Sequence, residues 1–460
     1  MASFVPRSEN ELVRRVVHLE RQLADRDEEI DRIFKLGRCI DLTAGDRELL
    51  TGERAKALLD TIDKGATGVV FGTKSFGAEA SIVAADVLGA LEALEHADLA
   101  DIIAGRPEEE ALEVLKKICG ALPKETLKSL DLSENALGEK GIRALEPVLK
   151  SLDALREITF MNNGLSELSV RLLSDCLPVA RLKKLEFHNN MSGPGGAIAA
   201  AEIVKSCPVL EEFRMSSSRV NAEGGLALIK ALCGKGETLT KINLSDSMFD
   251  DECTNELVKG LHNLPNLTDL ILRDTGLDKI EILQVLSVQN EAVPYLRILD
   301  LSGFELEEDD AELVGLLIKN RTRLRHLWLD DNELGSEGVV KMCLAGTSTP
   351  RPSMLETLSL ETNQIGQRGA VAVTKWALAH PTVKSVNLND NQIAATAVEL
   401  ICKLLKTNKG QHEMSVTMLN NEDDLDEDED IETEEQASDL LAQSDDLDAL
   451  TSELEKHLNI

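Results

Sequence analysis

Residues 127–137 read LKSLDLSENAL, and this pattern decides the fold because it recurs along the chain. Successive copies start 27 to 31 residues apart, most of them 28 or 29. Ten matches at so narrow a period indicate a solenoid built from one repeated unit. Further copies begin at Leu155, Leu182, Leu210, Leu239, Leu267, Leu296, Leu324, Leu355 and Val383.

Each copy predicts one strand and one helix. Leu130 and Leu132 alternate as in a short strand whose leucines face inward, and apolar residues follow at helical spacing in residues 138–149. A period of 28 to 29 residues leaves room for a full helix. We therefore predict an α/β fold, a right-handed leucine-rich-repeat solenoid like that of ribonuclease inhibitor, with parallel strands on the concave face and helices on the convex face.

Two weaker copies extend the repeats toward the N-terminus. GVVFGTKSFGAEA, around residues 69–80, and ADLADIIAGR, residues 97–106, lie one period apart. We predict about twelve repeats over residues 66–410. The ninth position of a copy holds an asparagine that bonds the turning backbone, except in the middle of the chain, where it is Ser218, Ser247, Thr275 and Phe304.

The two ends differ from the repeats. For residues 1–65 we predict a helical segment and cap, in which residues 9–34 have a heptad-like spacing that fits either a self-associating coiled coil or a lone helix. For residues 411–435 we predict a disordered acidic linker, because the like charges repel one another and the segment has few apolar side chains to bury in a core. Residues 436–460 regain helical periodicity and predict a short C-terminal helix.

The net charge of −33 restricts the partners. So acidic a surface repels nucleic acid and anionic lipid and favours a basic protein partner. No apolar run reaches the roughly 18 residues that span a bilayer, so we expect no membrane insertion. The eight cysteines are scattered without a CxxC pair, which predicts reduced, mostly buried thiols in a cytosolic or nuclear protein.

The sequence contains no nucleophile–base set, zinc motif or dinucleotide fingerprint. GVVFGTKS differs from a phosphate-binding loop because Thr73 separates Gly72 from Lys74. We therefore expect no cofactor and no self-contained active site.

Several segments resemble Ran GTPase-activating proteins. The early repeats are similar to those of the plant-type members, a solenoid followed by a dense acidic run is the family's layout, and the final ELEKHLNI is similar to the end of fungal members. The similar early segments are GTKSFGAEA (72–80), IAGRPEEEAL (103–112), LSENALGEKG (132–141), FMNNGLS (160–166) and FHNNMSGPGGA (187–197).

The resemblance implies a GTPase activator that serves nucleocytoplasmic transport. Such a protein docks on Ran in its GTP form and uses an asparagine, in place of an arginine finger, to hold Ran's own glutamine against the attacking water. GTP and Mg²⁺ then belong to the partner, and a Ran-binding protein as a further partner stays open. The asparagine corresponds to Asn162, and an arginine that the family needs corresponds to Arg106.

The register of the repeat adds an independent expectation. Asn162 lies one position before the ladder asparagine Asn163, where a side chain should leave the turn toward solvent. An ordinary surface asparagine is the alternative for Asn162, and a surface salt bridge to a nearby glutamate is the alternative for Arg106. We predict partner contacts at Glu134, Asn135, Asn189, Asp246 and Asp274.

The printed sequence departs from the family in two ways. It has no counterpart of the Trp-Pro-Pro domain of flowering-plant members or of the SUMO-attachment domain of animal members. We therefore expect a cytoplasmic protein, with a perinuclear position left open. The alternatives are a ribonuclease-inhibitor-like binder, although those proteins are rich in cysteine, and a passive scaffold.

Overall fold

The computed structural model describes residues 39–60, 63–289, 291–346, 353–407, 414–419 and 421. The chain forms two compact units, Met1–Leu165 with Leu172–Glu186, and Ser166–Arg171 with Phe187–Ile460. The boundary falls inside helix α6 (Glu167–Cys176) and strand β8 (Lys184–His188). The predicted helices of residues 9–34 and 436–460 lie outside the described residues, as does most of the predicted acidic linker.

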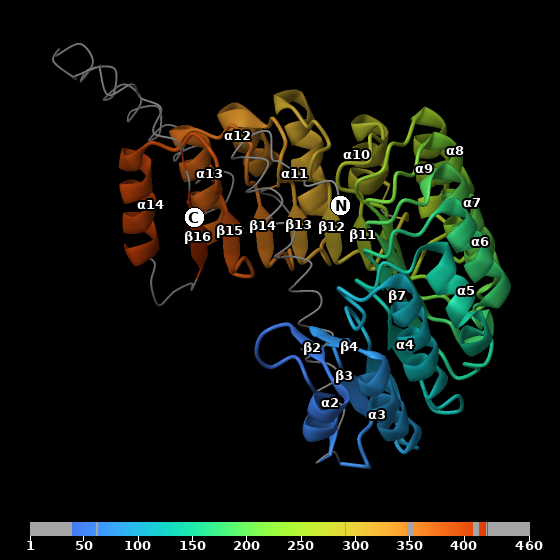
Figure 1. The fold of residues 1–460 in the computed structure, drawn as a ribbon. Helices are drawn as coiled ribbons and strands as arrows, with labels where there is room; N and C mark the ends of the chain where they lie inside the picture. The colour runs from blue at the N-terminus through green and yellow to red at the C-terminus, as the bar shows by residue number, and fades with distance from the viewer. Residues whose placement is uncertain are drawn as a thin grey trace, which may run out of the picture. The chain divides into compact units, whose positions relative to one another are not determined.

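The first unit alternates short parallel strands with helices (Figure 1). A second sheet pairs β2 (Glu48–Leu50) with β4 (Lys74–Phe76), also in parallel. The main strands, each paired with the next, are β1 (Cys39–Asp41), β3 (Gly68–Val70), β5 (His96–Asp98), β6 (Ser129–Asp131) and β7 (Glu157–Met161). The helical segments are α2 (Gly52–Leu59), α3 (Ala78–Gly89), α4 (Glu108–Gly120), α5 (Gly138–Leu149) and η1 (Val179–Arg181).

The second unit repeats the same alternation, and its helices lie on one side of its strands (Figure 1). The parallel strands, in order, are β9 (Glu212–Ser216), β10 (Lys241–Asn243), β11 (Asp269–Ile271), β12 (Ile298–Asp300), β13 (His326–Trp328), β14 (Thr357–Ser359), β15 (Ser385–Asn387) and β16 (Ser415–Thr417). The helical segments are α7 (Gly193–Ser206), α8 (Ala222–Cys233), α9 (Asp251–Leu261), α10 (Lys279–Ser287), η2 (Glu308–Asp310), α11 (Ala311–Asn320), α12 (Gly335–Gly346), α13 (Gln367–Leu378) and α14 (Ala395–Thr407).

The buried residues explain why this sequence forms a leucine-rich-repeat solenoid. In the repeat that begins at Leu127, both strand leucines are buried, with Leu130 exposing 1% of its surface and Leu132 none. Leu145 of α5 is buried with them. Gly138 turns the chain into this helix with φ +49°, a conformation that costs a glycine little. The predicted fold class is confirmed.

The sheet extends beyond the predicted repeat boundaries of 66 and 410. Strand β1 pairs with β3 ahead of the first boundary, and β16 pairs with β15 after the second. Helix α2, predicted as a cap, is thus the helix between two paired strands. The sequence pattern missed these units because its first position holds Gly37 before β1 and Glu413 before β16, where the clear copies have leucine or valine.

Buried asparagines cross-link adjacent repeats. In the second unit, Asn332 Oδ1 accepts from Phe304 N at 3.0 Å and Leu306 N at 2.9 Å, while its Nδ2 donates to Leu301 O at 3.1 Å and Leu329 O at 2.9 Å. Where threonine replaces asparagine, Thr275 Oγ1 donates only to Leu272 O, at 2.8 Å. The ladder therefore has fewer hydrogen bonds at Thr275 than at Asn332.

We expect Asn332→Ala to lower the free energy of unfolding of the second unit by about 2 kcal/mol, because buried amide and carbonyl groups lose their partners. Thr275→Ala, which removes one such bond, should cost about 1 kcal/mol. Both tryptophans, Trp328 and Trp376, lie in this unit, so their fluorescence during urea denaturation measures both variants. Equal losses would contradict this account of the ladder.

The cysteines are free thiols, and six of the eight are buried. Burial raises the pKa of the Cys119 thiol to about 12 and that of Cys253 to about 11, so both stay protonated near neutral pH. Among the described residues, no helix has the length and apolar character required to cross a bilayer.

Candidate functional site

The position that Asn162 occupies in its repeat has an unusual backbone conformation. Asn162 lies in the left-handed region with φ +49°, directly after the end of β7. Asn, Asp and Gly tolerate this conformation best, which explains why polar residues fill the position. We call this position the rim slot. The other clear repeats have the same left-handed backbone there, at Glu134, Asn189, Ser217, Asp246, Asp274, Gly303, Asp331, Thr362 and Asp390.

The carboxamide of Asn162 is half-buried and contacts the preceding repeat. Its Nδ2 donates to the Oε1 of Glu134, which occupies the rim slot of that repeat and is exposed. Glu134 therefore lies on the surface beside Asn162. Whether either side chain contacts a partner stays a prediction.

The turns that carry these two residues are held by buried hydrogen bonds. Asn163 exposes none of its surface and accepts at Oδ1 from Asn135 N at 3.1 Å. Glu134 N donates to Met161 O at 2.8 Å, and Met161 N donates to Ser133 Oγ at 3.0 Å. The ladder thus fixes the backbone on both sides of the Asn162–Glu134 pair.

Asn135 has a different role from the predicted partner contact. It exposes only 2% of its surface, its Nδ2 donates to Leu99 O at 2.8 Å, and its Oδ1 accepts from Ile102 N at 3.0 Å. The structure thus places this side chain in the ladder instead of on the surface, because the ninth position of a repeat points inward.

Arg106 is held inside the first unit by contacts that the sequence did not reveal. Its Nη2 donates to Ser75 O at 2.7 Å and to Leu50 O at 3.2 Å, and its Nε donates to Ser75 Oγ at 3.0 Å. The side chain exposes 16% of its surface, and the nearest carboxylate, of Glu110, is 3.9 Å from Nη1. A Cβ at Gly77 would lie 3.0 Å from Nη1, so this glycine leaves room for the guanidinium. Arg106 therefore connects β2 to β4.

We expect Arg106→Ala to loosen the β2–β4 sheet. Three hydrogen bonds are lost, so amide hydrogen exchange over residues 48–50 and 74–77 should become about 10 to 100 times faster. Arg143→Ala is a control in the same unit, because Arg143 makes an exposed pair with Glu139 at 2.8 Å. Unchanged exchange in the Arg106 variant would show that the guanidinium does not hold the sheet.

Lys74 of the GTKS segment has a structural role too. It is 3% exposed, and its Nζ donates to the carbonyl oxygens of Asp46 at 2.9 Å and Ala44 at 3.3 Å. This lysine fixes the loop before β2. No group of histidine, cysteine, aspartate or glutamate side chains suited to a metal ion occurs in the part of the chain that the structure describes.

A second arginine of the first unit was not singled out from the sequence. Arg47 is an exposed residue whose Nε donates to Asp101 Oδ2 at 2.9 Å. The hydrogen bond to Asp101 raises the pKa of Arg47, and the charge of Glu134 raises it further. Asp101 also has a left-handed backbone, with φ +61°, one repeat before Glu134. The only sequence signal for this pair is the position of Asp101 in its repeat, because Arg47 lies outside the leucine pattern.

The remaining predicted contacts belong to the second unit. Asn189 is exposed, and its backbone N donates to Ser216 O at 3.0 Å. Asp246 Oδ2 accepts from Ser217 Oγ at 2.5 Å, so rim-slot side chains of adjacent repeats are within hydrogen-bond reach here as well.

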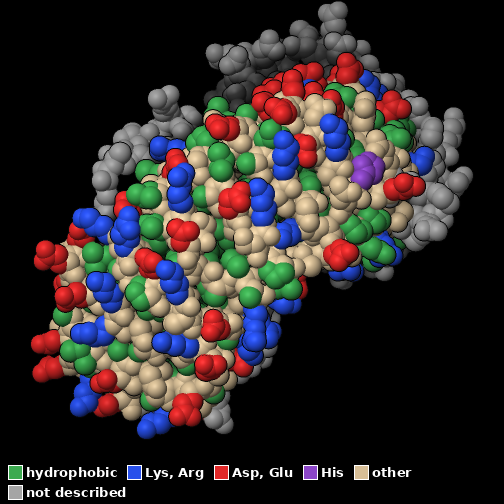
Figure 2. Space-filling model, turned by 90° about the vertical axis from the view of Figure 1, so that its right-hand side faces the viewer, with side chains coloured by type: hydrophobic (Ala, Val, Ile, Leu, Met, Phe, Trp, Pro, Cys, Tyr) green, Lys and Arg blue, Asp and Glu red, His purple; other side chains and the backbone are tan. Residues whose placement is uncertain are grey.

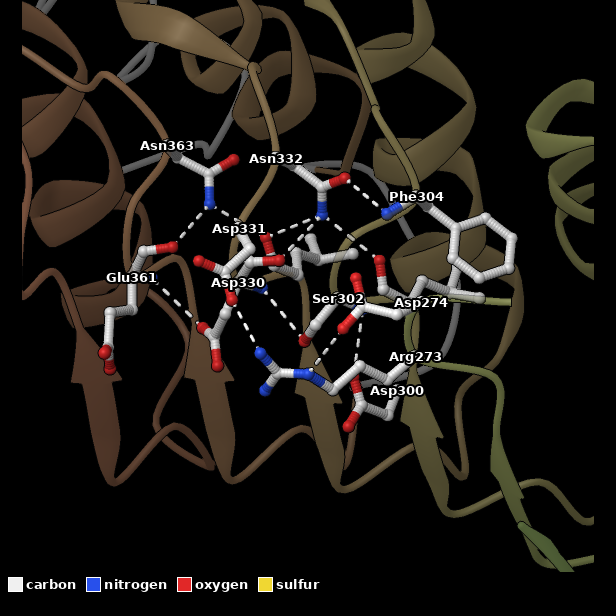
Figure 3. Close-up of polar contacts among 12 residues, drawn as sticks. Arg273, Asp274, Asp300, Ser302, Phe304, Asp330, Asp331, Asn332, Glu361 and Asn363 are labelled. Atoms are coloured by element: carbon white, nitrogen blue, oxygen red, sulfur yellow. Dashed lines mark hydrogen bonds and ion pairs between the residues drawn. The ribbon is translucent and has the colours of Figure 1, made fainter. Parts of the chain in front are cut away.

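Asp274 belongs to a charged network around Arg273 (Figure 3). Arg273 Nε contacts Asp274 Oδ2 at 3.1 Å, and Nη2 contacts Asp331 Oδ2 at 2.7 Å. Burial opposes the charged guanidinium, but the carboxylates of Asp274, Asp331 and Asp300 together raise the pKa of Arg273 above its ordinary value. The charge of Asp274 is therefore already paired within the chain.

The helix surfaces carry charged side chains of both signs. On the face drawn in Figure 2, Lys and Arg side chains alternate with Asp and Glu and with apolar patches. Many of these charges pair between or along helices, as Lys140 does with Glu108 and Arg171 with Glu167 at 2.6 Å. Such exposed pairs contribute little to stability.

Comparisons with known proteins agree with the repeat. The family described as Leucine Rich repeat matches residues 124–145, 322–343 and 379–402. The chain is 43% identical over 122 residues to RAN GTPase-activating protein 2 of Arabidopsis thaliana, which covers 26% of this chain and 22% of that protein. It is 42% identical over 125 residues to RAN GTPase-activating protein 1 of the same plant, covering 26% and 23%.

A third relative matches over a longer stretch at lower identity. The ribonuclease inhibitor of Sus scrofa is 24% identical over 316 residues, which covers 61% of this chain and 69% of the inhibitor. The matched segments span less than a quarter of the length of the two Arabidopsis proteins. The chain is thus a leucine-rich-repeat protein with a segment similar to plant Ran GTPase-activating proteins.

Proposed function

We propose that this protein stimulates GTP hydrolysis by the small GTPase Ran and so serves nucleocytoplasmic transport from the cytoplasm. The observation that carries the proposal is the 43% identity to RAN GTPase-activating protein 2, because the longer match to ribonuclease inhibitor reaches only 24%. The shared leucine-rich repeat alone accounts for an identity as low as that to ribonuclease inhibitor. The higher identity over a quarter of the chain needs a closer relationship.

The proposed mechanism assigns the decisive contact to Asn162. Its carboxamide holds the catalytic glutamine of Ran in the position that orients the attacking water. Activators of small GTPases accelerate GTP hydrolysis by about 10⁵, which corresponds to a lowering of the activation barrier by about 7 kcal/mol. The rim slot supports this role because it presents a short polar side chain at a backbone that the asparagine ladder holds in place.

Arg106 enters the proposal as a positioning residue, not as an arginine finger. Its donors are engaged by Ser75 and Leu50, and its side chain is largely buried. A finger would have to leave these contacts to reach the phosphates of a partner. We assign Arg106 the role of holding β2 and β4 in the unit that carries Asn162.

The partner contacts proposed beside Asn162 are rim-slot side chains. Glu134 lies in the first unit, and Asn189, Asp246 and Asp274 lie in the second. Three of the four are acidic, which fits a basic surface on the GTPase, and the charge of Asp274 is shared with Arg273 of the same chain. GTP and Mg²⁺ are supplied by Ran, so the activator brings no cofactor of its own.

A ribonuclease-inhibitor-like binder is the second candidate, and the match over 69% of the Sus scrofa inhibitor favours it. Two parallel assays of the purified protein separate the candidates. Phosphate release from Ran loaded with GTP should accelerate, while pancreatic-type ribonuclease should keep its full activity. Inhibition of the ribonuclease without an effect on Ran would replace the proposal with the second candidate.

A further inference from the structure

Glu134 and Asn162 occupy the rim slots of adjacent repeats in the first unit. Both have left-handed backbones, with φ +60° and +49°, so their side chains leave the two turns at equivalent positions. The carboxamide Nδ2 of Asn162 donates to Oε1 of Glu134. The pair therefore joins an exposed carboxylate to the half-buried side chain that the proposed function makes decisive.

The chemistry of the pair fixes which end of the carboxamide faces Glu134. An ionised carboxylate can only accept hydrogen bonds, so it binds the NH₂ end of an amide and not the oxygen end. Because Nδ2 takes the place next to Glu134, Oδ1 occupies the other position on the amide carbon and points in a different direction. Without the carboxylate, the two orientations of the amide differ only by a half turn about the last side-chain bond.

The orientation of Asn162 bears directly on its proposed task. When the catalytic glutamine uses its amide oxygen to hold the attacking water, its NH₂ group remains available to donate a hydrogen bond to another residue. An amide oxygen is the acceptor that such an NH₂ group needs, and an amide NH₂ in the same place would meet it donor to donor. Glu134 thus selects the orientation of Asn162 that can receive the partner's glutamine.

The surrounding backbone keeps the pair in register. Glu134 N donates to Met161 O at 2.8 Å, so the two turns are joined immediately beside both side chains. Gly138 N donates to Asn163 O at 3.0 Å on the other side of the same turns. A carboxylate at residue 134 is therefore held within reach of the Asn162 amide before any partner arrives.

We propose that Glu134 is a positioning residue that fixes the Asn162 carboxamide with Oδ1 toward the partner's glutamine. This inference rests on the proposed function, and it replaces the role of partner contact for Glu134. A partner contact would act mainly on the affinity for Ran. A positioning residue acts on the maximal rate once Ran is bound.

Single-turnover hydrolysis of Ran·GTP at increasing concentrations of the full chain separates these roles. Glu134→Gly keeps the left-handed backbone and removes the carboxylate, and we expect the maximal stimulated rate to fall about tenfold with unchanged half-saturation. Asp390→Gly removes a carboxylate from a rim slot of the second unit with φ +53° and should leave both parameters as they are. A rise in half-saturation with an unchanged maximal rate would overturn the inference.

A double variant tests whether Glu134 acts through Asn162. If it does, Glu134→Gly should have no further effect in a chain that already carries Asn162→Gly, because residues that act as a unit are not additive. Multiplying effects in the double variant would overturn the inference.

A measurement without Ran keeps the inference separate from the proposed function. In protein labelled with ¹⁵N-asparagine, the side-chain NH₂ signal of Asn162 should shift as the Glu134 carboxyl titrates, and Glu134→Gln should abolish the shift. An NH₂ chemical shift that does not change with pH would overturn the inference, regardless of the effect of the protein on GTP hydrolysis by Ran. A pH-dependent signal in a protein that does not stimulate Ran would overturn the proposed function alone.

Discussion

Replacing Asn162 with glycine is expected to lower the maximal rate of stimulated Ran·GTP hydrolysis by about 10² to 10³, the cost of removing one preorganised hydrogen-bonding group from a transition state. Glycine is the sharper substitution because Asn162 has a left-handed backbone, with φ +49°. Alanine would add backbone strain to the loss of the carboxamide. The fold should survive, because Asn163 holds the turn and Asn162 does not belong to the ladder.

The control for this variant is Thr362→Gly. Thr362 occupies a rim slot of the second unit with φ +53°, so the same backbone loses a side chain without any carboxamide being removed. We expect its stimulated rate to match that of the unchanged protein. A rate for Asn162→Gly equal to that of the control would remove Asn162 from the mechanism.

Replacing Arg321 with methionine is expected to destabilise the second unit by about 4 kcal/mol. Arg321 is 5% exposed, and its guanidinium donates to four carbonyl oxygens. Two of these belong to Val285 and Leu286 in the last turn of α10, where helix carbonyls lack partners of their own. Methionine keeps the apolar stem and leaves all four acceptors buried and unpaired.

Burial lowers the pKa of Arg321 to about 10, yet the side chain remains charged at neutral pH. The four carbonyl dipoles thus replace a carboxylate as the partners of this charge. Arg323→Ala is the matched control, because Arg323 is exposed and stacks over the Tyr295 ring at 4.5 Å, a contact worth about 1 kcal/mol or less at such a site. Tryptophan fluorescence during urea denaturation measures both, and equal losses would contradict the role given to Arg321.

The fold could be predicted because the same pattern of leucines and of the ninth-position residue recurs in most repeats. Leu130 and Leu132 are buried as the strand pattern requires, and Asn163 and Asn332 form the ladder that the ninth position requires. A pattern that recurs at a fixed period can be recognised even where one copy departs from it, as at Phe304. The outer units were missed because Gly37 and Glu413 stand where the clear copies of the pattern begin with leucine or valine.

The register of the repeat also separated Asn162 from Asn163. Two adjacent asparagines look alike in composition, but one lies at the ninth position and the other at the rim slot before it. The structure places Asn163 among buried backbone groups and leaves Asn162 half-buried beside Glu134. Periodicity alone therefore predicted which of the two belongs to the buried ladder.

The contacts of Arg106 could not be predicted in the same way. Its acceptors Ser75 and Leu50 lie 31 and 56 residues earlier in the sequence, and β2 and β4 form a sheet outside the repeat pattern. The pair of Arg47 and Asp101 is separated by 54 residues. Neither set of contacts recurs at the period of the repeat, so the sequence carries no signal for them beyond the position of Asp101 in its repeat.

The most direct test of the central claim is the single-turnover rate of phosphate release from Ran·GTP with and without this protein. The account predicts an acceleration on the order of 10⁵ at saturating concentration, most of which is lost in Asn162→Gly and kept in Thr362→Gly. An unchanged rate in the presence of the folded protein would contradict the claim that this repeat protein activates Ran.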